Sequence, residues 1–294
     1  MILHGETHLI LNPTANSGRA AACREDVAAY LARRGIEGIW HSTKGPGDAA
    51  GIVEGLPQGA LVVAVGGDGT VREVAAACVG RDLVLGVLPV GSGNDYVKAL
   101  GVGTRLEDAL RVLVDGRVKS VDTGEANGMP FINGLGIGFD AQVAAGVAKA
   151  PKYLGGTGRY LWSVARLLGG FRCHEATLVL DGDRVVETKT ILVAAALGTT
   201  YGARFRLAPD AVLDDGLFDV VWSEEVSRTE VLRLVPMALR GTLHRHPKVH
   251  LARARGIRVD LAEEIPAHVD GEMLAPTKHF EARVLPKALR VMVP

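Results

Sequence analysis

The sequence predicts an α/β domain with a doubly wound parallel sheet, followed by a second domain that is an antiparallel β-sandwich. Short apolar runs alternate with helical patterns from the start of the chain to about Asp122, and this alternation is typical of a parallel sheet with helices on its faces. Strand-like runs then dominate, with a hairpin signal at Asp181-Gly182. A chain of 294 residues, 48% of them hydrophobic, can fill two medium-sized cores.

The first domain is predicted from its strands and helices in order. We expect strands over residues 8–11, 36–41, 61–65 and 83–88, and helices over residues 19–34, 48–56 and 70–79. Thr104 and Glu107 form a capping-box pattern that predicts one more helix, ending at Gly116. Ligands bind beyond the carboxyl ends of the strands in such sheets. The turns that follow the strands are therefore the first candidates for a site.

The second domain is predicted to combine strands with three helices. Helices are expected over residues 141–149 and 160–168, and strands over 176–180, 185–196, 217–222, 257–261 and 281–285. A capping box from Ser227 to Glu230 opens the third helix. We expect domains of residues 1–124 and 125–289, with a last strand over 288–293 that returns residues 290–294 to the first domain.

Charge and cysteine content limit the partners and the compartment. The 33 basic and 33 acidic residues balance without a long block of one sign, so the charge does not favour nucleic acid. Cys23, Cys78 and Cys173 are widely spaced and odd in number, which is typical of free thiols in a reducing compartment. The first eight residues lack the apolar stretch of a signal peptide, and no apolar run approaches the roughly 20 residues that cross a bilayer. We expect a cytoplasmic protein with transient, peripheral membrane contact.

The turn Gly66-Gly67-Asp68-Gly69-Thr70 joins an apolar strand to a short helix. Its glycines let the backbone approach a ligand closely and point successive N–H groups at it, which suits a phosphate. The carboxylate of Asp68 would repel a bare phosphate, so the turn predicts a magnesium nucleotide. A plain tight turn is the alternative. The spacing matches neither a Walker A loop nor a Rossmann fingerprint.

Two further turns have a similar character. Asn12-Pro13-Thr14-Ala15-Asn16-Ser17 follows the first strand and offers amide and hydroxyl groups to a phosphate, although an elaborate helix cap is an equal alternative. Gly91-Ser92-Gly93-Asn94-Asp95 follows the strand over residues 83–88 and again places a hydroxyl and a carboxylate after a glycine. Two acidic, glycine-rich strand ends in one sheet favour a ligand site over simple turns.

These three turns, in this order, resemble the diacylglycerol kinase catalytic domain family, which includes sphingosine and ceramide kinases and bacterial lipid kinases. Pro209 to Asp219 and His268 to Glu272 resemble the family's second-domain signatures, so the resemblance spans nearly the whole chain. It implies the two-domain fold that this family shares with NAD kinases. It also implies magnesium-dependent transfer of the γ-phosphoryl group of ATP to a lipid alcohol, with diacylglycerol first among the acceptors, as a step in phospholipid biosynthesis.

The resemblance implies an ATP site built from the three turns and one further loop. Its residues are Asn12, Pro13, Thr14, Ala15, Asn16, Thr43, Gly67, Asp68, Gly69, Thr70, Val71, Arg72, Glu73 and Ser92. Thr43 rests on the resemblance alone, because it otherwise passes for an ordinary loop residue. Many relatives carry asparagine in place of Arg72, and bacterial relatives often carry two threonines, or threonine and alanine, at residues 92–93. The hydroxyl is retained at Ser92.

The resemblance also implies the catalytic groups. Glu272 is the expected general base, since phosphoryl transfer to an alcohol needs a carboxylate that accepts the hydroxyl proton. It is expected to point toward the γ-phosphate bound near Asp68, with Asp95 and Asp122 in support. Without the resemblance, the Asp270-Gly271-Glu272 segment would be interpreted as a plain surface turn.

Magnesium is implied at Asp215, with the backbone carbonyls of Val212 and Leu217. A donor set made only of oxygen suits this hard cation. From the residues alone, a tight Asp-Gly turn between strands is the favoured alternative.

Other interpretations of the chain remain open. An NAD kinase shares the turn at Asp68, although the Gly91 to Asp95 segment differs from the corresponding motif of those enzymes. A catalytically silent lipid-binding or regulatory protein is a second alternative, against which the intact carboxylates stand. A homodimer is a further assembly to consider.

Two groups of residues suggest additional contacts. His244, His246 and His250 invite a metal interpretation, but Pro247 interrupts a single helical face and a solvated loop is favoured. The basic residues of the segment 149–166 are interleaved with aromatic and leucine side chains. They are Lys149, Lys152, Arg159 and Arg166. This pattern predicts a membrane surface contact or, equally, an ordinary amphipathic helix.

Overall fold

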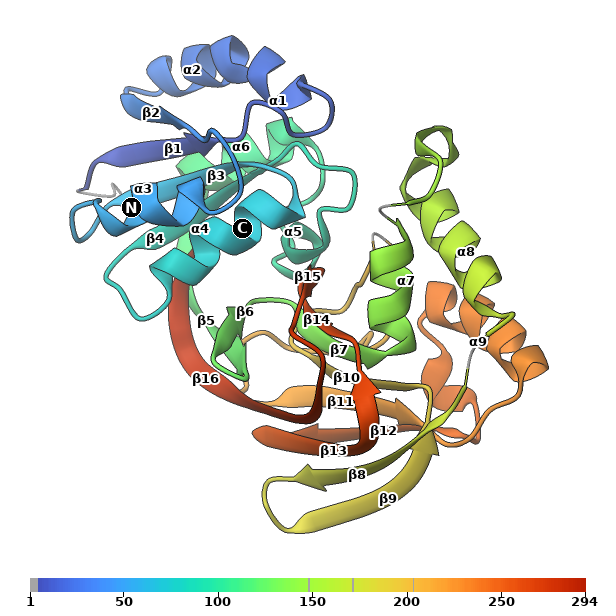
Figure 1. Cartoon of the computed structure of the whole chain (residues 1–294). Helices are drawn as coiled ribbons and strands as arrows, with labels where there is room; N and C mark the ends of the chain where they lie inside the picture. The colour runs from blue at the N-terminus through green and yellow to red at the C-terminus, as the bar shows by residue number, and fades with distance from the viewer. Residues whose placement is uncertain (1–4, 148, 171, 203) are drawn as a thin grey trace. The chain divides into compact units, whose positions relative to one another are not determined.

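The computed structural model describes residues 5–147, 149–170, 172–202 and 204–294 (Figure 1). The first four residues, on which the signal-peptide prediction partly rests, lie outside this part of the chain. The chain divides into two compact units: unit 1 consists of Met1–Thr123 and Pro286–Pro294, and unit 2 of Gly124–Leu285. The last strand, β16 (Thr277–Val293), contributes residues to both.

Unit 1 contains a parallel sheet. Its strands, in spatial order, are β2 (Gly38–Ser42), β1 (Thr7–Leu11), β3 (Leu61–Gly66), β4 (Val84–Pro89) and the end of β16. All of these pairs are parallel, and Arg290 of β16 lies opposite Val84 of β4. Every residue of β1, β3 and β4 is buried. Helices on both faces explain why these strands are continuous apolar runs rather than alternating ones.

The helices of unit 1 form two groups on opposite faces of this sheet (Figure 1). They are α1 (Arg19–Ala22), α2 (Arg24–Ala32), α3 (Asp48–Glu54), α4 (Asp68–Cys78), α5 (Asp95–Ala99) and α6 (Leu106–Asp115). Helix α3 contacts α4, and α2 contacts α6. The predicted doubly wound α/β arrangement is therefore confirmed.

Two details of the predicted helices are wrong. The single helix expected over residues 19–34 is interrupted at Cys23, whose ψ of −4° ends α1 before α2 begins. The capping box at Thr104 is not formed, because α6 begins after Arg105 and no side chain caps it. Glu107 is therefore the second residue of the helix. A capping box needs the glutamate at the third position, from which its side chain can accept the backbone N–H of the cap residue.

Unit 2 contains an antiparallel sheet of six strands. In spatial order they are β12 (Val249–Ala254), β11 (Phe218–Ser223), β10 (Leu192–Ala196), β7 (Gly134–Gly138), β14 (Ala267–Val269) and β15 (Glu272–Met273). His250 thus lies in strand β12, where its ring Nε2 is hydrogen-bonded to the carboxylate of Glu224 at 2.8 Å. The solvated loop expected for this residue is wrong. The alternating burial of β12 fits a strand with one face on the core.

A second antiparallel group in unit 2 contains β8 (His174–Leu180), β9 (Arg184–Thr190), β13 (Gly256–Ile265) and the first part of β16. A short ribbon pairs the end of β5 (Arg117–Ala126) with β6 (Met129–Phe131). The predicted hairpin at Asp181-Gly182 is confirmed by the pairing of β8 with β9. The strand expected over residues 185–196 is instead two strands in different sheets, because the chain changes sheet at Ile191.

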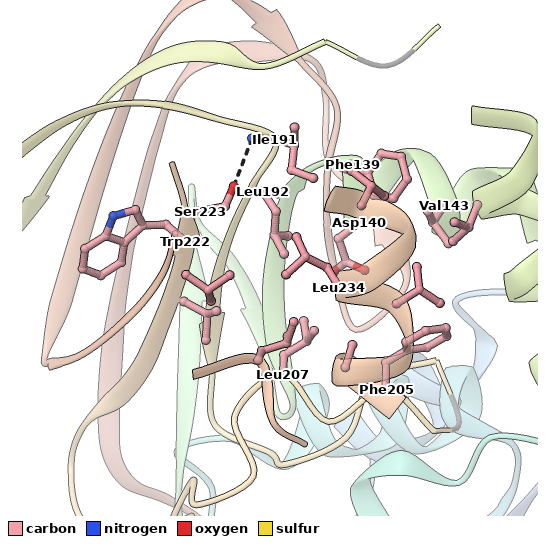
Figure 2. A pocket seen from close by; sticks show the side chains of 17 residues that line it. Phe139, Asp140, Val143, Ile191, Leu192, Phe205, Leu207, Trp222, Ser223 and Leu234 are labelled. Atoms are coloured by element: carbon pink, nitrogen blue, oxygen red, sulfur yellow. Dashed lines mark hydrogen bonds between the residues drawn. The ribbon is translucent and has the colours of Figure 1, made fainter. Parts of the chain in front are cut away.

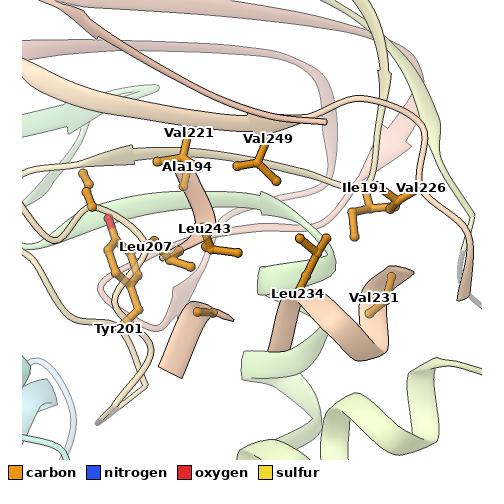
Figure 3. Close-up of a cluster of buried hydrophobic side chains, with 13 residues drawn as sticks. Ile191, Ala194, Tyr201, Leu207, Val221, Val226, Val231, Leu234, Leu243 and Val249 are labelled. Carbon is orange, nitrogen blue, oxygen red and sulfur yellow. The ribbon is translucent and has the colours of Figure 1, made fainter. Parts of the chain in front are cut away.

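The core of unit 2 lies between its six-stranded sheet and helix α9 (Arg228–Arg240), as Figure 3 shows. Leu234 and Val231 of α9 and Val221 of β11 are among its buried side chains. The predicted capping box at Ser227 and Glu230 is formed and begins this helix. The remaining helices of the described residues are α7 (Phe139–Val147), which follows β7 directly, η1 (Lys152–Leu154), α8 (Gly155–Leu167) and η2 (Leu243–Arg245). Helix α8 packs against α7. Among the described residues, every helix is too short or too polar to cross a membrane.

Candidate active site

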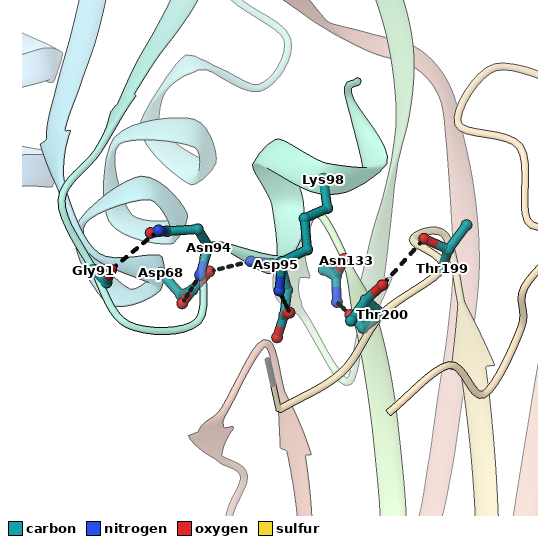
Figure 4. A network of polar contacts seen from close by, with 8 residues as sticks. All are labelled: Asp68, Gly91, Asn94, Asp95, Lys98, Asn133, Thr199 and Thr200. Carbon is teal, nitrogen blue, oxygen red and sulfur yellow. Dashed lines mark hydrogen bonds and ion pairs between the residues drawn. The ribbon is translucent and has the colours of Figure 1, made fainter. Parts of the chain in front are cut away.

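The carboxylate of Asp68 joins two of the glycine-rich turns in unit 1 (Figure 4). It accepts the backbone N–H of Asn94 at 2.8 Å and that of Asp95 at 2.7 Å. Those N–H groups open helix α5, so Asp68 acts as the cap of a helix that begins 27 residues after it. The neighbouring turn therefore gives Asp68 a structural role, and the divalent cation expected beside it stays a prediction.

Gly91 and Gly93 allow the two turns to approach closely enough for Asp68 to make these hydrogen bonds. A Cβ atom on Gly91 would lie 2.6 Å from the Cα atom of Gly67, and one on Gly93 would collide with the carboxylate of Asp68. Real Cβ atoms do not approach backbone so closely. At least two of the glycines that suggested a phosphate site are thus required for the turns to pack on each other.

A cavity in unit 1 brings together residues from three of the segments predicted to bind ATP. Its volume is about 600 Å³, part of it open to solvent. The predicted residues that line it are Asn12, Thr14, Thr43, Gly69, Thr70 and Glu73. The side-chain amide of Asn12 donates to the Thr70 hydroxyl at 3.2 Å and its oxygen accepts the Thr14 hydroxyl at 2.9 Å. The cavity therefore has a hydrogen-bonded polar wall.

The edge of this cavity is fixed by backbone contacts. The N–H of Thr43 donates to the carbonyl of Leu11, which extends the pairing of β2 with β1 past the end of the strands. A carboxylate oxygen of Glu73 accepts the N–H of Gly47 at 3.1 Å. Helix α4 begins at Asp68, after the cap residue Gly67, and no side chain caps it. Its first N–H groups are therefore available to an anion.

The other predicted ATP residues lie in different surroundings. Val71 is buried in the core, and Asn16 lines a separate cavity beside Arg19 and Arg105. The remaining ones, Pro13, Ala15, Gly67, Asp68, Arg72 and Ser92, belong to the same turns or helix but do not line the cavity. Lys44 does line it, and sequence reasoning missed this residue. Its position at the carboxyl end of a strand, next to Thr43, was the signal that could have identified it.

In unit 2, the turn that precedes Glu272 is held by a buried carboxylate. Asp270 and Gly271 both have positive φ angles, 50° and 86°, and connect β14 to β15. This geometry is that of a two-residue hairpin, for which Asp-Gly is a favoured pair. The Asp270 carboxylate accepts the N–H groups of Ile132, Asn133 and Gly134 at 2.8–2.9 Å. Burial raises the pKa of Asp270, and the three N–H groups oppose that shift.

Glu272 follows this turn as the first residue of β15, paired with Val269, and its side chain is exposed. Nearby, Asn133 donates its side-chain amide to the carbonyl of Thr200 at 3.0 Å (Figure 4). The hydroxyls of Thr200 and Thr199 are 3.3 Å apart. The turn that presents Glu272 is therefore held in place by a network of hydrogen bonds.

A largely apolar cavity lies in unit 2, with side chains pointing into it from α7, α9 and the six-stranded sheet (Figure 2). The space between its lining side chains is about 740 Å³, which includes the part that is open to solvent. The lining includes Phe139, Val143, Leu192, Phe205, Leu207 and Leu234. Its polar side chains are Asp140 and Ser223. Asp140 is held by the ring of His268, at 3.0 Å.

The residues expected to bind magnesium lie in a turn before β11. The Asp215 carboxylate accepts the N–H of Leu217 at 3.0 Å and forms an ion pair with Arg253 of β12. The oxygen donors of Asp215 and two carbonyls suit magnesium chemically, but the guanidinium already neutralises the carboxylate, so this arrangement does not fit a bound cation. Among the described residues there is also no group of three or more histidine, cysteine or acidic side chains arranged to hold a metal.

Two further acidic residues have structural partners. Asp122 is fully buried, and its carboxylate accepts the N–H of Lys287 at 2.8 Å, where β16 has a positive φ angle. Asp95 forms an ion pair with Lys98 at 3.0 Å. Asp122 thus stabilises the return of the chain into unit 1.

A doubly wound domain with glycine-rich turns at its strand ends, followed by an antiparallel domain with an apolar cavity, defines the fold class of NAD kinases and diacylglycerol kinases. Two family models agree. The diacylglycerol kinase catalytic domain matches residues 6–126, and the YegS C-terminal NAD kinase beta sandwich-like domain matches residues 134–293. The chain belongs to the diacylglycerol kinase catalytic domain family and is a kinase, and the family uses ATP as co-substrate.

Curated relatives support this assignment. A Bacillus subtilis protein named diacylglycerol kinase is 30% identical over 271 residues, covering 90% of this chain and 88% of the relative. A Mycobacterium tuberculosis protein of the same name is 28% identical over 301 residues, covering 99% and 96%. These matches extend over both units, so the resemblance seen in the motifs is confirmed for nearly the whole chain.

Solved structures show the same fold. A diacylglycerol kinase structure from Bacillus anthracis str. Sterne has a TM-score of 0.76 at 22% identity and covers 98% of this chain and 97% of its own. An NAD kinase from Archaeoglobus fulgidus, solved in complex with ATP, has a TM-score of 0.53 at 12% identity, covering 97% and 93%. At these identities the likeness concerns the fold alone.

Proposed function

We propose that the chain is a lipid kinase that transfers the γ-phosphoryl group of ATP to the hydroxyl of a lipid alcohol, with diacylglycerol as the first candidate. The apolar cavity of unit 2 carries this proposal. Its lining of aliphatic and aromatic side chains suits acyl or alkyl chains, and the single carboxylate on its wall, Asp140, suits one hydroxyl group. The names of the curated relatives support the same substrate class.

ATP is assigned to the turns of unit 1. The cavity at Asn12, Thr43 and Thr70 would hold the nucleoside end, and the first N–H groups of α4 would bind the phosphates. Asp68 and Asp95 would hold the two phosphate-binding turns together. Magnesium would arrive with ATP as part of the substrate complex. The separate magnesium position at Asp215 is a prediction that Arg253 opposes.

Glu272 is assigned as the general base. The acceptor oxygen would attack the γ-phosphorus, the bond from that phosphorus to the bridging oxygen would break, and ADP would leave with the electron pair. The hydroxyl proton would pass to the carboxylate of Glu272. The exposed side chain of Glu272 on a rigid turn supports this role, since a base must reach the acceptor from a fixed position.

The test is a panel of acceptors incubated with labelled ATP and magnesium. Diacylglycerol, a sphingoid base, ceramide, phosphatidylglycerol and a polyprenol would be offered in mixed micelles, and NAD in solution. We expect label in one lipid alcohol and none in NAD. Label in NAD alone would establish an NAD kinase, and label in no acceptor would favour a catalytically silent lipid-binding protein.

Glu272→Gln is the inactive control in that panel. We expect kcat to fall by about 100-fold or more, as removal of a general base usually does. The melting temperature should not change, because the side chain is exposed. Glu264→Gln, an exposed carboxylate elsewhere in unit 2, is the matched control and should retain full activity. Full activity of Glu272→Gln would refute the base assignment.

We also propose that helices η1 and α8 contact the membrane surface that supplies the acceptor. Tyr153 is 86% exposed and Leu161 39% exposed, and Arg166 lies 5.0 Å from the ring of Trp162. Aromatic and basic side chains together suit an anionic lipid surface. Lys152 also belongs to the basic group, although its side chain is outside the described residues. Sedimentation with anionic vesicles should be weaker for Tyr153→Asp than for the unchanged chain, and equal binding would refute the contact.

A further inference from the structure

His268 contacts two segments of unit 2 that the proposed function uses. Its Nε2 atom is 3.0 Å from a carboxylate oxygen of Asp140, which lines the apolar cavity. Its Nδ1 atom accepts the N–H of Gly271, also at 3.0 Å, in the turn directly before Glu272. The His268 side chain is only 6% exposed. One buried ring therefore connects the polar wall of the cavity with the turn that presents the assigned base.

The hydrogen bonds define which ring nitrogen carries the proton. Since the N–H of Gly271 points at Nδ1, this atom must be the acceptor, and the proton of the neutral ring resides on Nε2. Nε2 therefore donates to Asp140. The ring is fixed at both ends by different kinds of hydrogen bond, so rotation of the ring would break both contacts.

A glycine in the neighbouring strand β7 leaves room for the contact between His268 and Asp140. His268 lies directly opposite Gly136 of β7. A Cβ atom on Gly136 would collide with the Asp140 carboxylate and would lie 2.8 Å from Nε2 of His268. Residues from β7, β14 and α7 thus combine to accommodate one buried contact.

We propose that His268 is a positioning residue, which fixes Asp140 at the acceptor cavity and the Gly271-Glu272 segment relative to each other. This inference rests on the proposed function, in which the cavity binds the acceptor and Glu272 is the base. The acceptor hydroxyl must lie within hydrogen-bond reach of the base for the proton to move. A misplacement of about 1 Å costs roughly 100-fold in rate.

Two substitutions separate the two contacts. The side-chain oxygen of His268→Asn can take the place of Nδ1 and accept from Gly271, but it cannot reach Asp140. The longer amide of His268→Gln can take the place of Nε2 and donate to Asp140, but it leaves the N–H of Gly271 without its acceptor. We expect His268→Asn to raise KM for the lipid about tenfold, roughly the cost of one hydrogen bond to a charged group, with little change in kcat.

For His268→Gln we expect the opposite split, with KM for the lipid close to that of the unchanged enzyme and kcat lowered by about 10-fold to 100-fold. KM for ATP should stay constant in both variants. The matched control is His279→Asn, a surface histidine paired with Asp260 and 74% exposed, which should change none of these constants. Melting temperatures of all variants would be measured in parallel.

The outcomes distinguish this inference from the proposed function. If the unchanged enzyme phosphorylates no lipid alcohol, the proposed function fails and the positioning role falls with it. If the unchanged enzyme is active and both His268 variants change the same kinetic constant by the same factor, or lower only the melting temperature, the positioning role alone is refuted. Opposite changes in KM and kcat would establish it.

Discussion

Asp68 caps the helix that begins at Asp95, with its carboxylate oxygen 2.7 Å from the Asp95 backbone nitrogen. The two residues belong to different turns, each of which follows a strand of the parallel sheet. One side chain therefore sets the distance between two loops that the proposed function assigns to the phosphates of ATP. The cap is stabilised by the positive end of the helix dipole.

Asp68→Asn should loosen this pair of turns. An amide keeps one acceptor oxygen but presents an NH₂ group to the other backbone N–H, so one donor loses its partner. We expect the free energy of unfolding to fall by about 1–3 kcal/mol and KM for ATP to rise. Urea denaturation and steady-state kinetics would measure both. Asp183→Asn, at the exposed tip of the β8–β9 hairpin, is the control. An unchanged KM for ATP would contradict the role of these turns.

Val143→Phe should narrow the apolar cavity from the α7 side (Figure 2). Because the added ring occupies space assigned to the acyl chain, KM for a long-chain acceptor should rise about tenfold, the usual scale for a poor fit in an apolar pocket. A short-chain acceptor should be affected less, and KM for ATP should not change. Val185→Phe on the exposed face of β9 is the control. Equal effects on long and short chains would argue against acyl binding there.

Arg253→Ala tests the magnesium position at Asp215. If the guanidinium takes the place of a cation, its removal leaves the Asp215 carboxylate without that charge and free to bind a divalent ion. Addition of magnesium without nucleotide should then raise the melting temperature of Arg253→Ala more than that of the unchanged chain, since a ligand that binds only the folded state stabilises it. The same rise in both proteins would show that Arg253 does not compete with the ion.

The capping box of α9 should make stability depend on acid pH. Lys248 and the N–H and hydroxyl groups of Ser227 lower the pKa of Glu230 from 4.5 to about 2. Because the folded pKa is depressed, the stabilisation is complete above pH 4.5 and is lost as the pH falls toward 2. The melting temperature of Glu230→Gln should therefore be lower than that of the unchanged chain at pH 6, and the difference should vanish near pH 2. A constant difference would contradict the ionic character of the cap.

Local patterns in the sequence predicted those elements whose signals lie within a few residues of one another. The buried strands of unit 1, the Asp181-Gly182 hairpin and the cap at Ser227 all belong to this group. The prediction failed at the Thr104 cap and at strand β12. At Thr104 the start of the helix shifted by one residue, and His250 obtained its strand conformation by the pairing of β12 with β11.

The predicted site residues show the same division. Asn12, Thr43 and Thr70 were assigned to one site by resemblance, and they line one cavity in unit 1. The contact between His268 and Asp140 joins residues that are 128 positions apart. No short motif contains both, so sequence reasoning had no signal for it.

The sequence by itself determined the order of strands and helices, the turns at the strand ends and the family, because these depend on residue spacing and on short motifs. Only the tertiary structure decided what the acidic residues do. Asp68 became a helix cap, Asp215 the partner of Arg253, and Asp140 the partner of a buried histidine. The physical reason is that a carboxylate takes its role from the donors around it, and here those donors come from segments that meet only when the chain has folded.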